Sequence, residues 1–409
     1  RKRLRAIIKH AYENVPYYHN LFKEAKVDLD SINEISDLQK LPINQKSIFK
    51  KQPPELTVSS GMDIHKLKKV RTSGSTGTPF EVYINSSEDA WRKSIYMRAN
   101  IKCGQRLRDH WVVLTAPTHF HDVTNLQRKF GLFSQTVVSL FESTDQKIRQ
   151  VEAAKPDILD GYSASLVLLA KEVKRRGLKT INPRIVFGNA EFIDYESRHY
   201  IEDVFKAPYC DQFGCAELDR TAWQCLNRES YHMDVDSVIT EFLDKEGNPV
   251  SEGERGEIVY TSLFNFTMPI IRYAIGDVGV PTDDTCSCGV TLPLMKIVEG
   301  RKDSFLTLPG GRVLSPFIFN FAINRFKYYA DIDMYRIHQK KIDYFEIEMK
   351  MHRYPIEPSI LASEFVSHLK SYLEVKGDEV EFKISFVDEI PMPKTGKLNS
   401  VFSDLKAEI

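Results

Sequence analysis

The hydrophobic pattern of the first hundred residues predicts helices broken by prolines. Residues 1–55 carry helical patterns that the segments Asn-Val-Pro-Tyr-Tyr (14–18) and Leu-Pro-Ile-Asn-Gln-Lys (41–46) interrupt. Apolar and polar residues then alternate over 80–84, where Phe80, Val82 and Ile84 are the apolar positions, and this alternation predicts a strand. The pattern from 88 to about 102 predicts a helix.

Further along, short apolar runs alternate with a helical pattern. Trp111–Leu114 predicts a short apolar strand, and a second strand starts at Ile158 and runs into a turn. A helix is predicted from about Ser165 to Arg176, and another strand begins at Ile185 and ends in a glycine turn. Strands that alternate with helices favour an α/β fold with layered sheets and helices.

The pattern changes twice more before the end of the chain. From Tyr231 to Tyr273 it shows short strands separated by turns, which predicts a mostly β subdomain. Around Gly300 it shifts again, and the roughly 110 residues that follow are enough for a small α+β domain.

Composition restricts the class of protein. The chain has 409 residues, of which 42% are hydrophobic, so it can bury a large core in more than one domain. Lys plus Arg and Asp plus Glu both number 56, and this balance argues against a general nucleic-acid or anionic-membrane binder. We find no apolar run of about 18 residues, so no stable membrane insertion is expected. The basic start of the chain is too interrupted for a signal peptide, and a cytoplasmic protein is predicted.

The most informative segment is a loop rich in hydroxyl groups and glycine. It reads Arg-Thr-Ser-Gly-Ser-Thr-Gly-Thr-Pro-Phe over 71–80. Glycines let backbone N–H groups approach an anion, and hydroxyls add further donors, so the loop is a candidate phosphate clasp. It lacks the Lys that the Walker pattern requires after the second glycine, and a flexible connection remains the alternative. The candidate phosphate ligands are Thr72, Ser73, Gly74, Ser75, Thr76, Gly77 and Thr78.

Two carboxylates follow aromatic or glycine residues. In Tyr-Cys-Asp-Gln-Phe-Gly-Cys-Ala-Glu, which ends at Glu217, Phe213 could lie against a planar base and Glu217 could ligate Mg²⁺. In Arg-Tyr-Ala-Ile-Gly-Asp, which ends at Asp277, an acidic group after a glycine at a strand end could accept the hydroxyls of a ribose. In each case an ordinary turn is the alternative.

The last third of the chain adds a candidate hinge and a lysine loop. Gly-Arg-Lys-Asp-Ser (300–304) stands at the shift in pattern, where a glycine with flanking charges suits a hinge or an ordinary linker. Pro-Met-Pro-Lys-Thr-Gly-Lys (391–397) predicts a stiff exposed loop that presents Lys397 to a phosphate or a carboxylate, or simply to water.

Four residues have the spacing of a metal site. Cys225 precedes His232 by a short segment, and Cys286-Ser-Cys288 follows some fifty residues later. Three thiolates and one imidazole fit a closed tetrahedral structural zinc. Free buried cysteines and a surface histidine are the alternative. Cys103, Cys210 and Cys215 are predicted to be ordinary buried residues. His119 and His121 follow a predicted strand end, and loop histidines are one interpretation of them.

The order of these segments resembles the adenylate-forming superfamily of acyl-CoA synthetases, peptide-synthetase adenylation domains and luciferases, over nearly the whole chain. Finer features are similar to the phenylacetate–CoA ligase branch, which includes bacterial proteins encoded with capsule and lipopolysaccharide biosynthesis. These features are Asn14-Val-Pro-Tyr-Tyr-His, Leu41-Pro-Ile-Asn-Gln-Lys, Leu159-Asp-Gly-Tyr-Ser-Ala-Ser, Gly188-Asn-Ala-Glu and Cys286-Ser-Cys-Gly.

The resemblance implies a domain organisation. A large N-terminal domain over 1–300 would bind ATP and the acid and would carry the zinc-bearing β subdomain at about 225–290. A small mobile α+β domain over 301–409 would act as a lid, with its hinge at Asp303.

The resemblance also implies roles for single residues. It offers a second interpretation of His119 and His121, as neighbours of an acyl site. The loop Thr72–Thr78 would hold the phosphates of ATP, and Glu217 would hold Mg²⁺. Lys397 would bridge carboxylate and α-phosphate in the adenylation transition state, where lysine, metal and loop donors offset the developing charge. Arg301 would share the ribose with Asp277. The adenine pocket would be lined by Gly188, Asn189, Ala190, Glu191, Phe213 and Gly214.

The implied activity is that of an ATP-dependent, AMP-forming ligase. It would activate a small carboxylic acid as acyl-AMP and pass the acyl group to an amine in capsule or lipopolysaccharide biosynthesis, with CoA as the alternative acceptor. One position departs from the family, because Ala216 stands where a Thr or Ser usually precedes the Mg²⁺ glutamate. That departure keeps open a different class, a nucleotide-binding scaffold with little catalysis.

Overall fold

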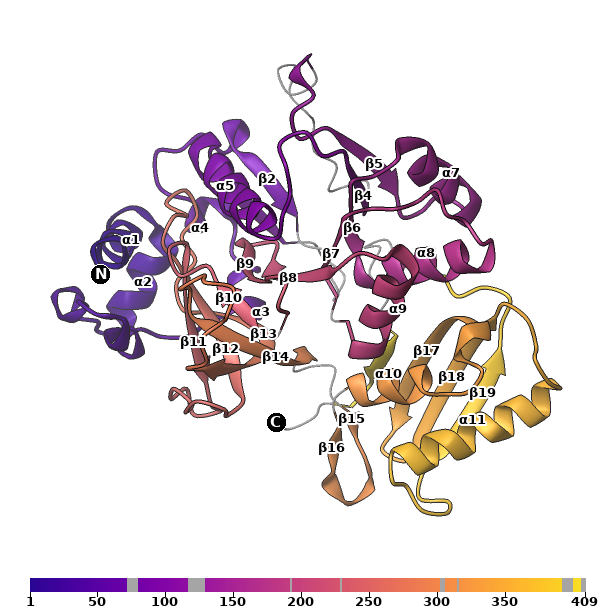
Figure 1. The fold of residues 1–409 in the computed structure, drawn as a ribbon. Helices are drawn as coiled ribbons and strands as arrows, with labels where there is room; N and C mark the ends of the chain where they lie inside the picture. The colour runs from indigo at the N-terminus through magenta and orange to yellow at the C-terminus, as the bar shows by residue number, and fades with distance from the viewer. Residues whose placement is uncertain are drawn as a thin grey trace. The chain divides into compact units, whose positions relative to one another are not determined.

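A computed structural model describes residues 1–71, 80–116, 129–191, 193–228, 230–301, 306–314, 316–391 and 400–405. The chain divides into two compact units, and Figure 1 labels their helices and strands. The first unit combines Arg1–Gly104 with Gln212–Val298, and the second combines Gln105–Asp211 with Glu299–Ile409. The predicted lid therefore shares a unit with residues 105–211. The domain boundary at residue 300 stays a prediction.

The first unit begins with the helices that the sequence predicts. They are α1 (Lys2–Asn14), α2 (Pro16–Glu24), α3 (Lys46–Phe49) and α4 (Pro54–Thr57). Pro16 lies in the first turn of α2, where its missing N–H costs nothing. Helix α1 buries Leu4, Ile7, Ile8 and Ala11, the i, i+3, i+4 and i+7 positions of one face.

The rest of the first unit is mainly antiparallel sheet, as the short strands predict. Its strand order is β11-β12-β13-β14-β10-β9-β8. The strands are β8 (Tyr209–Cys215), β9 (Asp219–Gln224), β10 (Tyr231–Met233), β11 (Val238–Leu243), β12 (Gly256–Ser262), β13 (Tyr273–Thr282) and β14 (Leu294–Arg301). The chain passes from the second unit to the first within β8.

A hairpin and a long helix complete the first unit. β2 (Lys68–Arg71) pairs antiparallel with β3 (Glu81–Ile84), the strand predicted from alternation. Helix α5 (Ser86–Lys102) starts two residues before the predicted position, because the side chain of Asn85 accepts from the N–H of Glu88 and that of Glu88 accepts from the N–H of Asn85.

In the second unit, residues 105–211 form a parallel α/β layer. Its strand order is β7-β6-β4-β5, and neighbouring strands are parallel. The strands are β4 (Trp111–Thr115), β5 (Gln135–Ser139), β6 (Ile158–Tyr162) and β7 (Ile185–Asn189). Helices α7 (Thr144–Ala154), α8 (Ser163–Arg175) and α9 (Tyr195–Phe205) pack against them through a core that includes Leu114, Leu159, Val186, Leu166 and Phe205.

In the C-terminal part of the second unit, the described residues form a four-stranded sheet with two helices, which confirms the predicted α+β pattern. The strand order is β19-β18-β17-β20. β17 (Ile332–Lys341) and β18 (Tyr344–Met351) form an antiparallel hairpin, flanked in parallel by β19 (Glu381–Phe386) and β20 (Val401–Ser403). Helices α10 (Phe317–Asn324) and α11 (Pro358–Tyr372) share its core, and β15 (Leu306–Thr307) pairs with β16 (Val313–Leu314).

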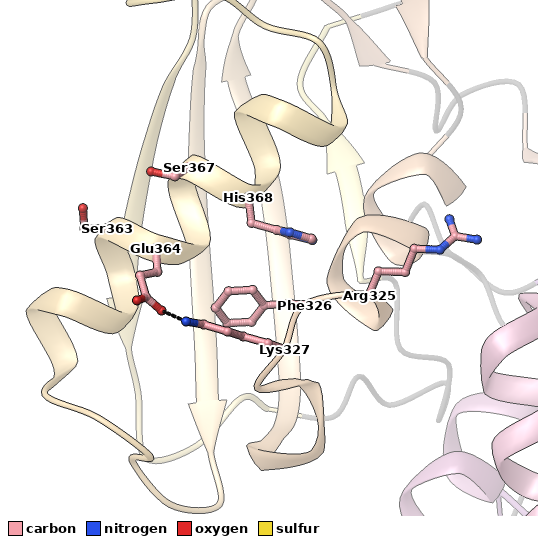
Figure 2. A pocket seen from close by; sticks show the side chains of 7 residues that line it. All are labelled: Arg325, Phe326, Lys327, Ser363, Glu364, Ser367 and His368. Carbon is pink, nitrogen blue, oxygen red and sulfur yellow. Dashed lines mark ion pairs between the residues drawn. The ribbon is translucent and has the colours of Figure 1, made fainter.

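A surface cavity of about 420 Å³ lies between the end of α10 and α11, and Figure 2 shows the side chains that line it. The buried ring of Phe326 is among its lining residues, and Lys327 and Glu364 form an ion pair there with their charged atoms 2.8 Å apart.

Within the described part of the chain, no helix has both the length and the apolar character that a membrane crossing requires. Taken together, the two units confirm the predicted mixed α/β class.

Candidate functional site

Several predicted residues lie outside the described part of the chain. They are Thr72–Thr78 of the hydroxyl-rich loop, His119, His121, Asp303 and Lys397. Arg301 is the last residue of β14, and its side chain is likewise outside the description. The roles given to these residues stay predictions.

In the second unit, Gly188–Glu191 lie at the carboxyl end of β7, beside the carboxyl end of β6. Ligands of open parallel sheets bind outside this edge. The side chain of Asn189 donates to the carboxylate of Asp160 at 2.6 Å, and Ser163 donates from its hydroxyl to the backbone oxygen of Glu191 at 2.9 Å. The segment is therefore held by contacts to β6 and to the start of α8.

Gly188 has no alternative at its position. A Cβ built on it would lie 1.5 Å from the hydroxyl oxygen of Tyr209 on the next strand, so any side chain would displace that fully buried ring. Ala190 follows with φ of 66°, a left-handed conformation that turns the chain away from the strand. The strand ends in a turn as predicted, but the turn is made at Ala190 and not at the glycine, because Gly188 lies within β7, where the packing of Tyr209 excludes a side chain.

In the first unit, Glu217 is 1% exposed and its two carboxylate oxygens differ. Oε1 lies 2.7 Å from the ammonium of Lys46 and accepts from the hydroxyl of Tyr273 at 2.9 Å. Oε2 is buried and has no hydrogen-bond partner among the described residues. Burial alone raises the pKa of a carboxyl, but the Lys46 ammonium and the hydrogen bonds outweigh it, so the pKa of Glu217 is lowered and the group is ionised.

A buried, ionised oxygen without a partner is unusual, because such a group carries a large desolvation cost. A cation that completes its coordination removes that cost. Mg²⁺ in nucleotide sites is bound by one or two carboxylates together with phosphates and water. The environment of Glu217 therefore fits the predicted Mg²⁺ ligand, with Oε2 as the atom that would face the metal.

Lys46 is a site residue that sequence reasoning missed. The two-residue strand β1 (Asn44–Gln45) pairs in parallel with the start of β13, opposite Tyr273 and Ala274. Lys46 follows directly, as the first residue of α3. The segment 41–46 resembles one of the family, but nothing in the sequence connects its lysine to Glu217.

Arg92 of α5 supports the segment around Glu217 from the other side. It is 5% exposed and donates to the backbone oxygens of Ala216 and Glu217. Asn265 also donates to the backbone oxygen of Glu217, at 3.4 Å. These contacts fix the backbone of 216–217, so the carboxylate is held by both its main chain and its side chain.

The other predicted nucleotide residues of the first unit lie on β8 and β13. Phe213 is half-buried on β8, with its ring edge-on to Tyr231 at 6.4 Å between centroids. Gly214 is required, since a Cβ there would lie 2.1 Å from the backbone oxygen of Asp219. Asp277 does not stand at a strand end as expected. It lies within β13, after Gly276 with φ of 84°, where the β12–β13 register shifts. A bulge, rather than a strand terminus, sets its position.

The predicted metal ligands come together in the first unit. One ligand atom from each of Cys225, His232, Cys286 and Cys288 lies within 4.8 Å of all the others. The sulfur atoms of Cys225 and Cys286 are 3.5 Å apart, and the sulfur of Cys288 is 3.4 Å from Nε2 of His232. Burial lowers the pKa of His232, which favours the neutral imidazole that binds metals. The grouping is confirmed, and its donor set is that of a structural zinc site.

The other three cysteines differ in how far they are buried. Cys103 and Cys210 are buried, as predicted. Cys215 is not fully buried by its side-chain exposure, so the prediction is wrong for that residue. It is the last residue of β8, where the strand turns toward Glu217.

Comparison with known proteins shows which class of proteins has this fold. No family model matches the chain. The crystal structure of a 2-hydroxyisobutyryl-CoA ligase in the postadenylation state, in complex with 2-HIB-AMP, superposes with a TM-score of 0.80 at 18% identity, covering 98% of this chain and 88% of that one. The fold is therefore that of the adenylate-forming ligases, which are AMP-forming enzymes.

Sequence relatives narrow the class. The phenylacetate–coenzyme A ligase of Thermus thermophilus is 24% identical over 320 residues, which are 76% of this chain and 72% of that protein. Protein CapK of Staphylococcus aureus is 21% identical over 407 residues, 96% of this chain and 86% of that protein. The chain is similar to the phenylacetate–CoA ligase-like branch of the adenylate-forming superfamily, and the predicted resemblance is confirmed.

Proposed function

We propose that this protein activates a small carboxylic acid with ATP and transfers the acyl group to an amine, forming an amide during capsule or lipopolysaccharide biosynthesis. In the first step a carboxylate oxygen attacks the α-phosphorus, the bond to the β-phosphate breaks, and acyl-AMP and pyrophosphate form. In the second step the amine attacks the acyl carbonyl, AMP leaves, and a proton is released. The capsule setting rests on the resemblance to that group of bacterial proteins.

The observation that carries the proposal is the environment of Glu217. Lys46 and Tyr273 occupy one oxygen of its buried carboxylate and leave the other without a partner among the described residues. Glu217 would hold Mg²⁺, which offsets charge on the phosphates as the carboxylate attacks. Lys46 would keep Glu217 ionised and oriented. The loop Thr72–Thr78, together with Lys397, would bind the reacting phosphates.

The remaining nucleotide contacts are part of the same proposal. The adenine would lie by Gly188–Glu191 and Phe213, and the ribose by Asp277 and Arg301. Residues 301–409 would move about Asp303 between the two steps, so that Lys397 leaves after the first.

Acid-dependent pyrophosphate release tests this function directly. Purified protein with Mg²⁺ and ATP is supplied with a panel of sugar carboxylates, amino acids and simple or aromatic acids, and then with an amine or with CoA. We expect release with a subset of the acids, and an amide product that needs no CoA. A thioester formed only with CoA would instead establish the acyl- or aryl-CoA ligase.

A second candidate function follows from Ala216. Its side chain offers no hydroxyl to the adenylate phosphate, so a nucleotide-binding scaffold with little catalysis is the alternative. ATP binding by calorimetry, without acid-dependent pyrophosphate release across the panel, would favour the scaffold.

We also propose that the cluster of Cys225, His232, Cys286 and Cys288 holds a structural zinc. It joins the end of β9 and strand β10 to the loop before β14, so the metal would tie that loop to the sheet. We expect about one zinc per chain in the wild type and in the Cys103→Ser control. We expect far less in Cys286→Ser, with a lower melting temperature, because metal binding adds to folding stability. Near-zero zinc in all three proteins would remove the site.

A further inference from the structure

In the second unit, Lys171 of α8 reaches the C-terminal segment. The residue is 4% exposed, and its ammonium donates to the backbone oxygen of Ile332 at 2.8 Å. The same nitrogen lies 3.8 Å from the centroid of the Tyr329 ring. Burial lowers the pKa of Lys171 to about 7, and the nearby Arg175 guanidinium contributes to the shift. Few lysines are this buried, and those that are have specific partners.

Arg175, one turn further along α8, contacts the same segment. Its guanidinium pairs with the carboxylate of Asp333 at 2.6 Å and donates to the backbone oxygen of Ala330 at 3.2 Å. Two cationic side chains of α8 therefore contact the short helical turn Tyr329–Asp331 and the start of β17.

Helix α9 adds two polar contacts to this surface. Asn324 at the end of α10 donates to the hydroxyl of Ser197 at 3.1 Å, and Arg325 pairs with Glu196 at 2.6 Å. In Figure 2 the side chain of Arg325 points away from the Lys327–Glu364 ion pair. Its guanidinium pairs with Glu196 of α9 instead. We call Lys171, Arg175, Glu196 and Ser197 the seat.

The chemistry of the seat suits a contact that forms and breaks. It consists of ion pairs, hydrogen bonds and one ammonium–ring contact, and each of these groups can be hydrated when the partner leaves. Lys171 keeps the free-energy difference between the docked and released states small, because its ammonium loses water on docking and regains it on release. A permanent domain contact would more typically bury apolar side chains at these positions.

We propose that Lys171 and Arg175 are positioning residues that seat residues 301–409 on α8 and α9 in one of the orientations used during the reaction cycle. This inference rests on the proposed function, because that function requires the C-terminal segment to move between the two steps. Neither residue needs to touch ATP or the acid, and both act on the reaction through the lid.

The neighbouring residues supply matched controls for a test. Lys171→Met and Asp333→Asn remove seat contacts. Lys174→Met removes a charge from the same helix, and Arg176→Gln removes one from the residue that follows it. Lys174 lies over the Tyr200 ring, and Arg176 pairs with Asp145 and Glu172. We expect faster amide hydrogen exchange in Tyr329–Asp331 for the seat variants and wild-type exchange for the controls.

The second readout is the ratio of the adenylation rate to the acyl-transfer rate. We expect both seat variants to change it in the same direction by about fivefold, and the controls to leave it unchanged. Unchanged exchange in the seat variants overturns the seat. Changed exchange with an unchanged ratio shows a structural contact only and overturns the positioning role. If no variant releases pyrophosphate with any acid, the proposed function fails, while the exchange result still reports on the seat.

Discussion

Replacement of Glu217 by glutamine is expected to lower acid-dependent pyrophosphate release by about 100-fold, the scale typical of losing one stabilising charge in an active site. The amide keeps the shape of the side chain but removes the negative charge that would hold Mg²⁺. The apparent affinity for Mg²⁺ should fall as well, and raising the metal concentration should recover part of the rate. Initial rates measured over a series of Mg²⁺ concentrations check both expectations.

Stability must be separated from catalysis in this variant, because Lys46 loses its partner. We expect a cost of about 1–3 kcal/mol from the unpaired group, measured by denaturant unfolding. The double variant Glu217→Gln with Lys46→Met should regain part of that stability and none of the activity. Glu241→Gln is a control, because Glu241 is a largely buried carboxylate of the same unit paired with Arg272 at 3.0 Å. Wild-type pyrophosphate release in Glu217→Gln would contradict the metal role.

Alanine at Lys397 is expected to reduce adenylation by about 100-fold or more while leaving acyl transfer from supplied acyl-AMP nearly intact. The physical reason is that two anions meet when a carboxylate attacks the α-phosphate, and an ammonium between them lowers the barrier mainly in that step. Pyrophosphate release measures the first step, and product formation from chemically prepared acyl-AMP measures the second.

Lys394 provides the matched control for Lys397. It lies in the same Pro-Met-Pro-Lys-Thr-Gly-Lys segment, and Lys394→Ala should stay within about twofold of the wild type, as expected for a solvated lysine. Equal losses in the two variants would indicate a general effect of charge on the loop. An unchanged rate in Lys397→Ala would show that the catalytic assignment is wrong.

Local patterns predicted the elements well where each element is specified by its own residues. The strands at 111, 158 and 185 and helices α5 and α8 appear within a few residues of the predicted positions. Helix α8 begins at Ser163 instead of Ser165, because β6 leads into it without an intervening loop. The error at Asp277 has a different cause. A β-bulge depends on the register with a neighbouring strand, which no local pattern contains.

The sequence by itself determined the class of this protein. The types and spacing of Cys225, His232 and the Cys286–Cys288 pair predicted that these residues form one cluster. The order of the ligase motifs predicted the fold. Only the tertiary structure decided which lysine side chain contacts which buried polar group. Lys46 reaches Glu217 because β1 pairs with β13, and Lys171 reaches Ile332 because α8 packs beside the C-terminal segment. Both contacts join residues far apart in the chain. In the sequence a buried lysine cannot be distinguished from an exposed one, because only tertiary packing removes the side chain from water.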